Sequence, residues 1–276
     1  MKSILSFQSS VTFGAVGNTM ASVVMAEFGH HLCRADTIQL IAHPGYGGRA
    51  GGTLSDDDFK SMLNGLKKFA LQDRVDSIMT GYMGTPDQVE MIANAIAHIQ
   101  KFKKDCDVLV DPAFGDHGRL YVDPKIADQI TTKLMPLADV MTPNFFEFEY
   151  MMGTALSSQE DVINAGQDCL ARFPKLKAIA VTGCSFGDSD NISDIWIDHQ
   201  GHTHHSAPSL IHNNGMSGGG DLFAALLMSI RMSGADWRDS FKDTAMLCRR
   251  IINGADKVDA KDIDLKYLKN VLKDHA

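Results

Sequence analysis

Short apolar runs of strand length recur along the chain, and helical patterns separate most of them. They lie at residues 4–7, 37–41, 75–80, 108–110, 140–141 and 178–182. Strand-length runs that alternate with helices indicate parallel strands joined by crossover helices. Repeated right-handed crossovers place helices on both faces of the sheet. The sequence therefore predicts an α/β fold with a mostly parallel central sheet.

Capping residues predict where three of the helices begin. Ser55 with Asp58 three residues later resembles a capping box, and apolar residues then recur at helical spacing. Residues 85–88 combine a Thr cap, Pro at the first helical position and Gln at the third. Asp123 followed by Pro124 predicts a third helix start in the same way.

The segment from 191 to 208 differs from the rest and is expected to form an antiparallel hairpin at one sheet edge. It carries an apolar triplet and then His202, His204 and His205. These histidines could bind a metal ion, but a solvated hairpin is the favoured interpretation. No long linker, charge block or low-complexity tract interrupts the chain, so we expect one domain over residues 1–276.

Composition excludes several classes of function. The chain has 276 residues and a net charge of −8, and no basic stripe suits a nucleic-acid surface. No apolar run approaches the roughly 20 residues of a membrane span, and the N-terminus turns polar too soon for a signal peptide. The five cysteines lack CxxC spacing, which argues against structural zinc. We expect a cytoplasmic protein with reduced thiols that binds neither nucleic acid nor membranes.

A glycine run opens onto an aspartate and then an apolar helix pattern that extends to Met232. Gly218, Gly219 and Gly220 allow φ values closed to other residues, so that several N–H groups can converge on one anion. The helix N-terminus adds free donors and its dipole. Asp221 would be repelled by a bound phosphate unless it takes a proton from an attacking hydroxyl. The alternative is a flexible turn in which Asp221 only caps the helix.

Polar and glycine residues follow the first three predicted strands, where sheets of this kind bind ligands. Ser9 precedes a loop with two glycines, and Tyr82 follows the third strand. His43 opens the glycine-rich segment 45–52, which is expected to act as a flap that closes over a substrate. Ordinary turn loops are the alternative at each of these positions.

Carboxylates and amides follow the next strands. Asp111 and Asp116 lie five residues apart around a Pro–Gly loop and could hold magnesium near phosphates. Asn144 and Glu147 share a helix face and suit water-mediated magnesium binding. Structural turn aspartates and an ordinary first-turn acid are the competing interpretations. Thr182, at the sixth strand, offers a hydroxyl beside a glycine, which suits a phosphate.

Taken in order, these residues resemble the ribokinase superfamily, and most closely its pyridoxal kinase branch. The glycine run with Asp221 resembles the Gly-x-Gly-Asp motif, and residues 144–147 resemble the Asn-x-x-Glu magnesium motif. The features of the branch lie at residues 8–9, 14–18, 43–46, 80–82, 111–116 and 121–122. A Walker A motif, a protein-kinase signature set and a GxGxxG after the first strand are missing from the sequence.

The resemblance implies a ribokinase-like fold with flap loops and ATP-dependent phosphorylation of pyridoxal, pyridoxine or pyridoxamine, giving pyridoxal 5′-phosphate in vitamin B6 salvage. It implies that Asp221 is the base toward the 5′-hydroxymethyl group and that residues 218–220 form the anion hole. It further implies magnesium, and a monovalent cation such as K⁺, organised by Asp111, Asp116 and Glu147. The implied pyridine pocket contains Ser9, His43 and Tyr82, and the implied ATP site contains Asp111, Asn144, Thr182, Gly218, Gly220 and, on a flap, Tyr121. Relatives are usually homodimers, so a homodimer is expected.

The chain also departs from this pattern. Gly219 replaces a Thr or Val, removing a hydroxyl that Ser217 could supply; Pro44 and Ser10 replace a common Thr and His. These departures bear on substrate choice. Two alternatives therefore stay open: a kinase for hydroxymethylpyrimidine or another small alcohol, and a vitamer-binding protein without turnover.

Overall fold

The computed structural model describes residues 1–187, 191–208, 216–255 and 261–274. The described strands are β1 (Ser3–Val11), β2 (His31–Leu40), β3 (Gly51–Thr53), β4 (Ser77–Thr80), β5 (Asp107–Val110), β6 (Gly115–Asp116), β7 (Arg119–Leu120), β8 (Val140–Met141), β9 (Ala178–Cys184), β10 (Asn191–Asp198) and β11 (Gly201–Pro208). The described α-helices are α1 (Gly17–Glu27), α2 (Asp56–Lys68), α3 (Pro86–Phe102), α4 (Pro124–Gln129), α5 (Phe145–Met152), α6 (Gln159–Arg172), α7 (Gly219–Met232), α8 (Trp237–Ala255) and α9 (Leu265–Leu272). Short 3₁₀ or π turns occupy 44–46, 71–74, 130–134 and 135–137.

Nine of these strands form one sheet in the order β11-β10-β9-β8-β5-β4-β1-β2-β3. The six strands from β9 to β2 are parallel, whereas the hairpin β10–β11 and the short β3 are antiparallel additions at the two edges. The mostly parallel α/β sheet predicted from the sequence is confirmed, and so is the edge hairpin at 191–208. The small strands β6 and β7 form a separate ribbon.

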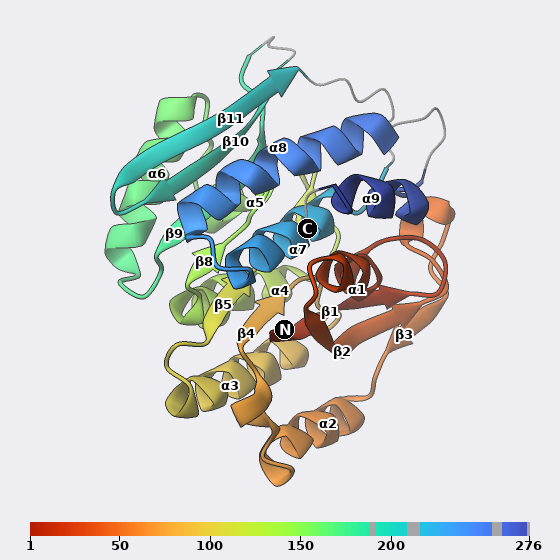
Figure 1. Ribbon diagram of the computed structural model, residues 1–276. Coiled ribbons are helices and arrows are strands. Elements are labelled where there is room, and N and C mark those ends of the chain that lie inside the picture. Colours follow the sequence, from red (N-terminus) through yellow and green to blue (C-terminus); the bar gives the residue numbers. More distant parts are fainter. Residues whose placement is uncertain (188–190, 209–215, 256–260, 275–276) are drawn as a thin grey trace.

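Helices cover both faces of the sheet and enclose one apolar core on each side. Figure 1 shows α1, α7, α8 and α9 on one face, where their side chains join Trp196 and Met79 in a single buried cluster. On the other face α2 to α6 pack over a second cluster that contains Phe7, Phe59 and Phe148. Within the described residues, none of the helices combines the length and the apolar character that a membrane span requires.

The three predicted helix starts are confirmed at the level of their caps. The side chains of Ser55, Thr85 and Asp123 accept hydrogen bonds from backbone N–H groups at the starts of α2, α3 and α4. Gln88 does not close a capping box. Its side chain accepts from the Gly84 N–H and donates to the Thr37 carbonyl, which ties α3 to the neighbouring β2.

The strand order reverses direction between β1 and β4. The chain passes from β1 to its neighbour β2 through α1, and from β4 to β5 on the other side through α3. Ligands of open α/β sheets bind beyond the carboxyl ends of the strands at such a switch point. Many of the predicted site residues lie toward this edge: His43, Tyr82, Asp111 and Asn144 follow β2, β4, β5 and β8, while Ser9 and Thr182 lie in the last part of β1 and β9.

Candidate active site

The glycine run forms the start of α7, as the sequence predicted. Gly218 is the N-cap residue, with φ of 98° and no side-chain cap, and a Cβ there would lie 2.5 Å from the Ala15 carbonyl oxygen. Only glycine fits that position. Of the three glycines that allow unusual φ values, only Gly218 adopts one, and Gly219 and Gly220 do not have positive φ. Both belong to the helix itself, and no atom lies within 4 Å of a Cβ built on Gly220. Gly220 therefore presents bare backbone to open space, whereas a Cβ on Gly219 would lie 3.4 Å from Cδ1 of Ile252.

Asp221 is the third residue of α7, and its carboxylate meets the start of a second helix. The N–H of Gly17, the first residue of α1, donates a hydrogen bond to this carboxylate. Burial raises the pKa of Asp221, and the Gly17 N–H and the nearby His43 imidazole offset only part of that rise. A raised pKa makes this carboxylate a stronger proton acceptor than an ordinary aspartate.

Three carboxylates, from Asp111, Glu147 and Asp221, lie within electrostatic reach of one another. Asp111 directly follows β5, is 5% exposed, and accepts a 3.1 Å hydrogen bond from the Thr142 hydroxyl. Burial raises the pKa of Asp111 well above its usual range, and repulsion from Glu147 and Asp221 raises it further. Among the described residues, no ion pair involves any of the three acids. The cluster would therefore be stabilised by a bound cation.

Glu147 is held by the loop that follows β5. Its Oε1 accepts from the N–H groups of Phe114 and Gly115 at 2.8 and 3.2 Å, and its Oε2 accepts from the Asn144 N–H at 2.9 Å. Asn144 caps α5 in return and donates its side-chain amide to the Gly115 carbonyl. Burial raises the pKa of Glu147 to about 7 although three N–H groups oppose that rise. The Asn-x-x-Glu spacing thus builds a capping box that fixes the position of the acidic loop.

The carboxylates suit a cation that is held through water and phosphate oxygens. Asp116 lies on β6, its side chain is 56% exposed, and it accepts from the neighbouring His117 N–H. In the part of the chain that the structure describes, no group of three His, Cys, Asp or Glu side chains is arranged to bind a metal ion directly. Both oxygens of the Glu147 carboxylate already accept hydrogen bonds from backbone N–H groups, which leaves few lone pairs for a direct metal bond. Hydrated Mg²⁺, which usually keeps several waters, fits this donor set.

Two tyrosines from different loops cover the acid cluster. The rings of Tyr82, after β4, and Tyr121, after β7, stack with centroids 6.2 Å apart at 22°. Burial raises the pKa of the Tyr121 hydroxyl most, and repulsion from the negative charges of Glu147 and Asp111 raises it further. Tyr121 is therefore close to the cluster, although the residue is 51% exposed. Residues predicted for separate subsites thus lie in contact.

Thr182 and Asn144 lie side by side at the ends of β9 and β8. The two residues form an isolated parallel bridge, and the Thr182 N–H donates to the Pro143 carbonyl at 2.9 Å. Ser9 lies in β1 directly against Gly17, where any Cβ would overlap the Ser9 carbonyl. Both residues lie inside their strands, Ser9 in β1 and Thr182 in β9, because each strand extends beyond the apolar run that predicted it.

His43 is buried and has a partner that the sequence did not reveal. The His43 Nδ1 accepts from the Gly45 N–H at 3.2 Å, and its Nε2 lies 3.2 Å from Oδ1 of Asp262. The Tyr46 hydroxyl donates to Oδ2 of the same carboxylate at 2.6 Å. The segment that begins at His43 is therefore attached at its base. No local pattern around Asp262 signals this contact, because its partners lie more than 200 residues away.

The structure shows what surrounds three positions connected with the departures from the family pattern. Ser10 is buried and accepts a 2.6 Å hydrogen bond from Arg34. Pro44 begins a short 3₁₀ turn and is exposed. Ser217 is paired with Asp262 through an isolated bridge.

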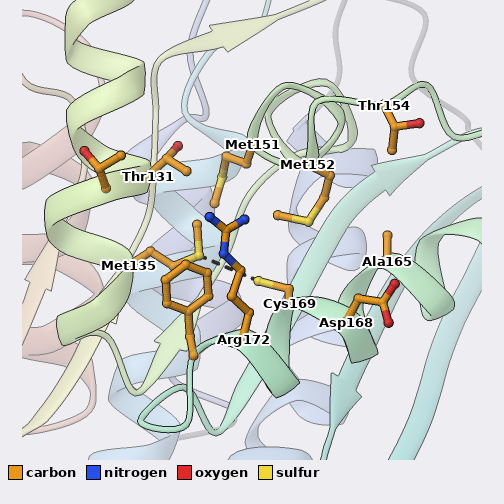
Figure 2. Close-up of a pocket in the computed structure, with 11 residues that line it drawn as sticks. Thr131, Met135, Met151, Met152, Thr154, Ala165, Asp168, Cys169 and Arg172 are labelled. Atoms are coloured by element: carbon orange, nitrogen blue, oxygen red, sulfur yellow. Dashed lines mark hydrogen bonds between the residues drawn. The ribbon is translucent and has the colours of Figure 1, made fainter.

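A separate pocket of about 390 Å³ lies elsewhere, beside α5 and α6 (Figure 2). Its lining includes Met135, Met151, Met152, Cys169 and Arg172. It contains none of the predicted site residues, so we do not assign the chemistry to it.

Comparisons with known proteins identify a family and similar folds. The family model described as "Phosphomethylpyrimidine kinase" matches residues 60–264. The chain is 28% identical over 256 residues to "Pyridoxal kinase PdxY" of Vibrio campbellii, covering 92% of this chain and 88% of that protein. The fold is similar to pyridoxal kinase from Entamoeba histolytica, with a TM-score of 0.89, 23% identity and coverage of 99% and 96%. It is also similar to pyridoxal kinase from Leishmania donovani in complex with ADP and pyridoxine, with a TM-score of 0.88, 22% identity and coverage of 98% and 95%.

Proposed function

The chain belongs to the phosphomethylpyrimidine kinase family, and from that premise we propose that it transfers the γ-phosphoryl group of ATP to the 5′-hydroxymethyl group of pyridoxal, pyridoxine or pyridoxamine. The relative in Vibrio campbellii is named a pyridoxal kinase and aligns over 92% of this chain. One observation carries the chemistry. Asp221, a carboxylate of raised pKa, lies at the junction of two helix N-termini beside uncapped, open backbone.

In this proposal Asp221 accepts the proton of the substrate hydroxyl while that oxygen attacks the γ-phosphorus. The first-turn N–H groups of α7, at Gly219 and Gly220, stabilise the charge on the transferring group, and the N-cap Gly218 sets their direction. Phosphoryl transfer depends mainly on positioning and electrostatic stabilisation. The glycine loop and Asp221 supply both from adjacent residues.

Asp111, Glu147 and Asp116 would hold magnesium through water and the ATP phosphates. When bound, Mg²⁺ neutralises charge on the β- and γ-phosphates. Asp111 supplies the buried negative charge, while Glu147 fixes the loop that carries Asp111 and Asp116. The proposed ATP site also contains Asn144, Thr182, Tyr121, Gly218 and Gly220. The proposed pyridine pocket contains Ser9, His43 and Tyr82.

Several finer expectations stay predictions. These are a single domain over residues 1–276, a monovalent cation such as K⁺ beside magnesium, a homodimer, a cytoplasmic location and closure of the segment 45–52. Attachment of Tyr46 to Asp262 restricts where that closure can hinge, since the beginning of the segment is already fixed.

A second candidate is a kinase for hydroxymethylpyrimidine. The description of the matching family and the altered residues Ser10 and Pro44 favour it. ADP release measured with each pyridine and pyrimidine alcohol in turn separates the two candidates. We expect the highest kcat/KM with a B6 vitamer. A higher value with hydroxymethylpyrimidine would replace the leading proposal, and tight vitamer binding without ADP would indicate a binding protein.

A further inference from the structure

One carboxylate outside all of the sequence motifs connects the loops that surround Asp221. We propose that Asp262 is a positioning residue, which holds His43 in place at the acceptor-alcohol side of the site. This inference rests on the proposed function, because it concerns how the same site binds its alcohol substrate.

The contacts of Asp262 come from separate segments of the chain. Its Oδ1 accepts from the Ala15 N–H at 3.1 Å and faces the His43 Nε2 at 3.2 Å, while its Oδ2 accepts from the Tyr46 hydroxyl at 2.6 Å. The side chain is only 10% exposed. A carboxylate that accepts two hydrogen bonds and faces an imidazole at 3.2 Å constrains all three groups, because each would lose a charged partner if it moved.

The backbone of Asp262 is anchored to the glycine loop itself. The Ser217 N–H donates to the Lys261 carbonyl at 3.0 Å, and Ser217 and Asp262 form a parallel bridge. The next residue, Ile263, is 1% exposed within the core beneath α7. Asp262 therefore moves with the residue that directly precedes Gly218.

Two neighbouring glycines, Gly14 and Gly45, lie so close to Asp262 and His43 that a side chain at either position would clash with them. A Cβ on Gly14 would lie 2.7 Å from Oδ1 of Asp262, and a Cβ on Gly45 would lie 2.6 Å from Cε1 of His43. Both glycines thus allow the backbone to approach the carboxylate and the imidazole closely. The Asp262–His43 pair is thus closely packed at both the carboxylate and the imidazole.

The orientation of the His43 ring follows from its two nitrogens. Since Nδ1 accepts from the Gly45 N–H, the neutral ring carries its proton on Nε2, which faces Asp262. The same ring is close enough to Asp221 that a positive charge on it lowers the pKa of that carboxyl. His43 is therefore near both the carboxylate that orients it and the carboxylate that we propose as the base. Without Asp262 the ring would keep only the hydrogen bond from the Gly45 N–H and its packing against Tyr46, and the Nε2 side would lose its charged partner.

The test compares Asp262→Asn and Asp262→Ala with wild type in steady-state ADP release, varying pyridoxal and ATP separately. Asp264→Asn is the matched control. Asp264 lies two residues away and caps α9 by accepting from the Tyr267 N–H, a role that Asn fills equally well. We expect Asp262→Ala to raise the KM for pyridoxal at least about tenfold, because small displacements of substrate-positioning groups cost up to about 100-fold. The KM for ATP and the control should stay within about twofold of wild type.

Asp262→Asn keeps an acceptor oxygen for Ala15 and should recover part of the loss. Tyr46→Phe removes one donor from an exposed side chain, so it should raise the KM for pyridoxal in the same direction without unfolding the protein. If Asp262→Ala does not fold, these two variants decide. An unchanged KM for pyridoxal in Asp262→Asn and Tyr46→Phe, or an equal rise in both KM values, would overturn the inference.

Failure of the proposed function has a different signature. In that case wild type itself would release no ADP with pyridoxal. Calorimetric titration of pyridoxal into wild type and Asp262→Asn then tests the positioning role without turnover. Weaker binding by the variant supports the inference, and equal binding refutes it.

Discussion

Alanine at Gly218 and alanine at Gly220 are expected to change stability in opposite directions, although both glycines belong to one run. At Gly218 the φ of 98° is unfavourable for alanine by about 1–2 kcal/mol. The new Cβ would also lie 2.5 Å from the Ala15 carbonyl oxygen, and such overpacking typically costs about 1–3 kcal/mol. Together these terms predict a loss of about 2–5 kcal/mol in the free energy of unfolding.

Gly220 presents the reverse case. It lies within α7, and a Cβ there meets no atom within 4 Å. Alanine in a helix is favoured over glycine by up to about 1 kcal/mol, which corresponds to a rise of about 1–3 °C in Tm for a chain of this size. The same methyl group would fill the space proposed for the migrating phosphoryl group. Alanine keeps the N–H at this position, but a phosphoryl group displaced by the methyl group would lose its hydrogen bond. Loss of one donor to a developing oxyanion costs about 100- to 1,000-fold in kcat, and we expect a loss of that order.

The assay pairs thermal unfolding with ADP release from the same preparations. Gly65→Ala is the matched control, because Gly65 lies inside α2 with only ordinary contact to Phe69. It should stabilise the protein and leave kcat unchanged. Full turnover by Gly220→Ala would refute the assignment of the anion site to the start of α7. A Gly218→Ala protein as stable as wild type would refute the backbone argument.

Two further predictions concern the acid cluster. Asp111→Asn should raise Tm, because it removes a buried charge that Glu147 and Asp221 repel. The same variant should lower the apparent affinity for Mg²⁺, measured in activity titrations, by about 10- to 100-fold. A lower Tm would contradict the argument about the buried charge. Burial raises the pKa of Glu147 from its ordinary 4.5 to about 7, so its contribution to stability is complete below about pH 4.5 and is lost as the pH rises through about 7. In urea unfolding, the free energy of unfolding of wild type should fall by roughly 3 kcal/mol between about pH 4.5 and 7, and that of Glu147→Gln should not show this fall. The same pH dependence in both proteins would contradict a raised pKa at Glu147.

The central parallel strands could be predicted because they are buried and mostly apolar. The runs at 108–110 and 178–182 match β5 and most of β9. The first half of β2, residues 31–36, was missed because it carries Arg34 and Asp36, which form a 2.8 Å ion pair. Periodicity cannot identify a strand whose polar residues are satisfied by tertiary partners.

The candidate site was predictable only where its residues lie close together in sequence. The Asn144–Glu147 spacing indicated a shared helix face, and the capping box confirms that proximity. The contacts of Glu147 with Phe114 and Gly115 span more than 30 residues, so no local pattern could indicate what the carboxylate holds. Asp262 and Ala15 are 247 residues apart. Such contacts are fixed by packing of the whole chain.

The central claim is that Asp221 removes a proton from the substrate alcohol while ATP donates its phosphoryl group. The most direct measurement is ADP formation by wild type and Asp221→Asn at saturating ATP, Mg²⁺ and pyridoxal, together with pyridoxal binding by each protein. The account predicts that Asp221→Asn binds pyridoxal but that its kcat falls by about 100- to 10,000-fold. Turnover by Asp221→Asn close to that of wild type would contradict the account.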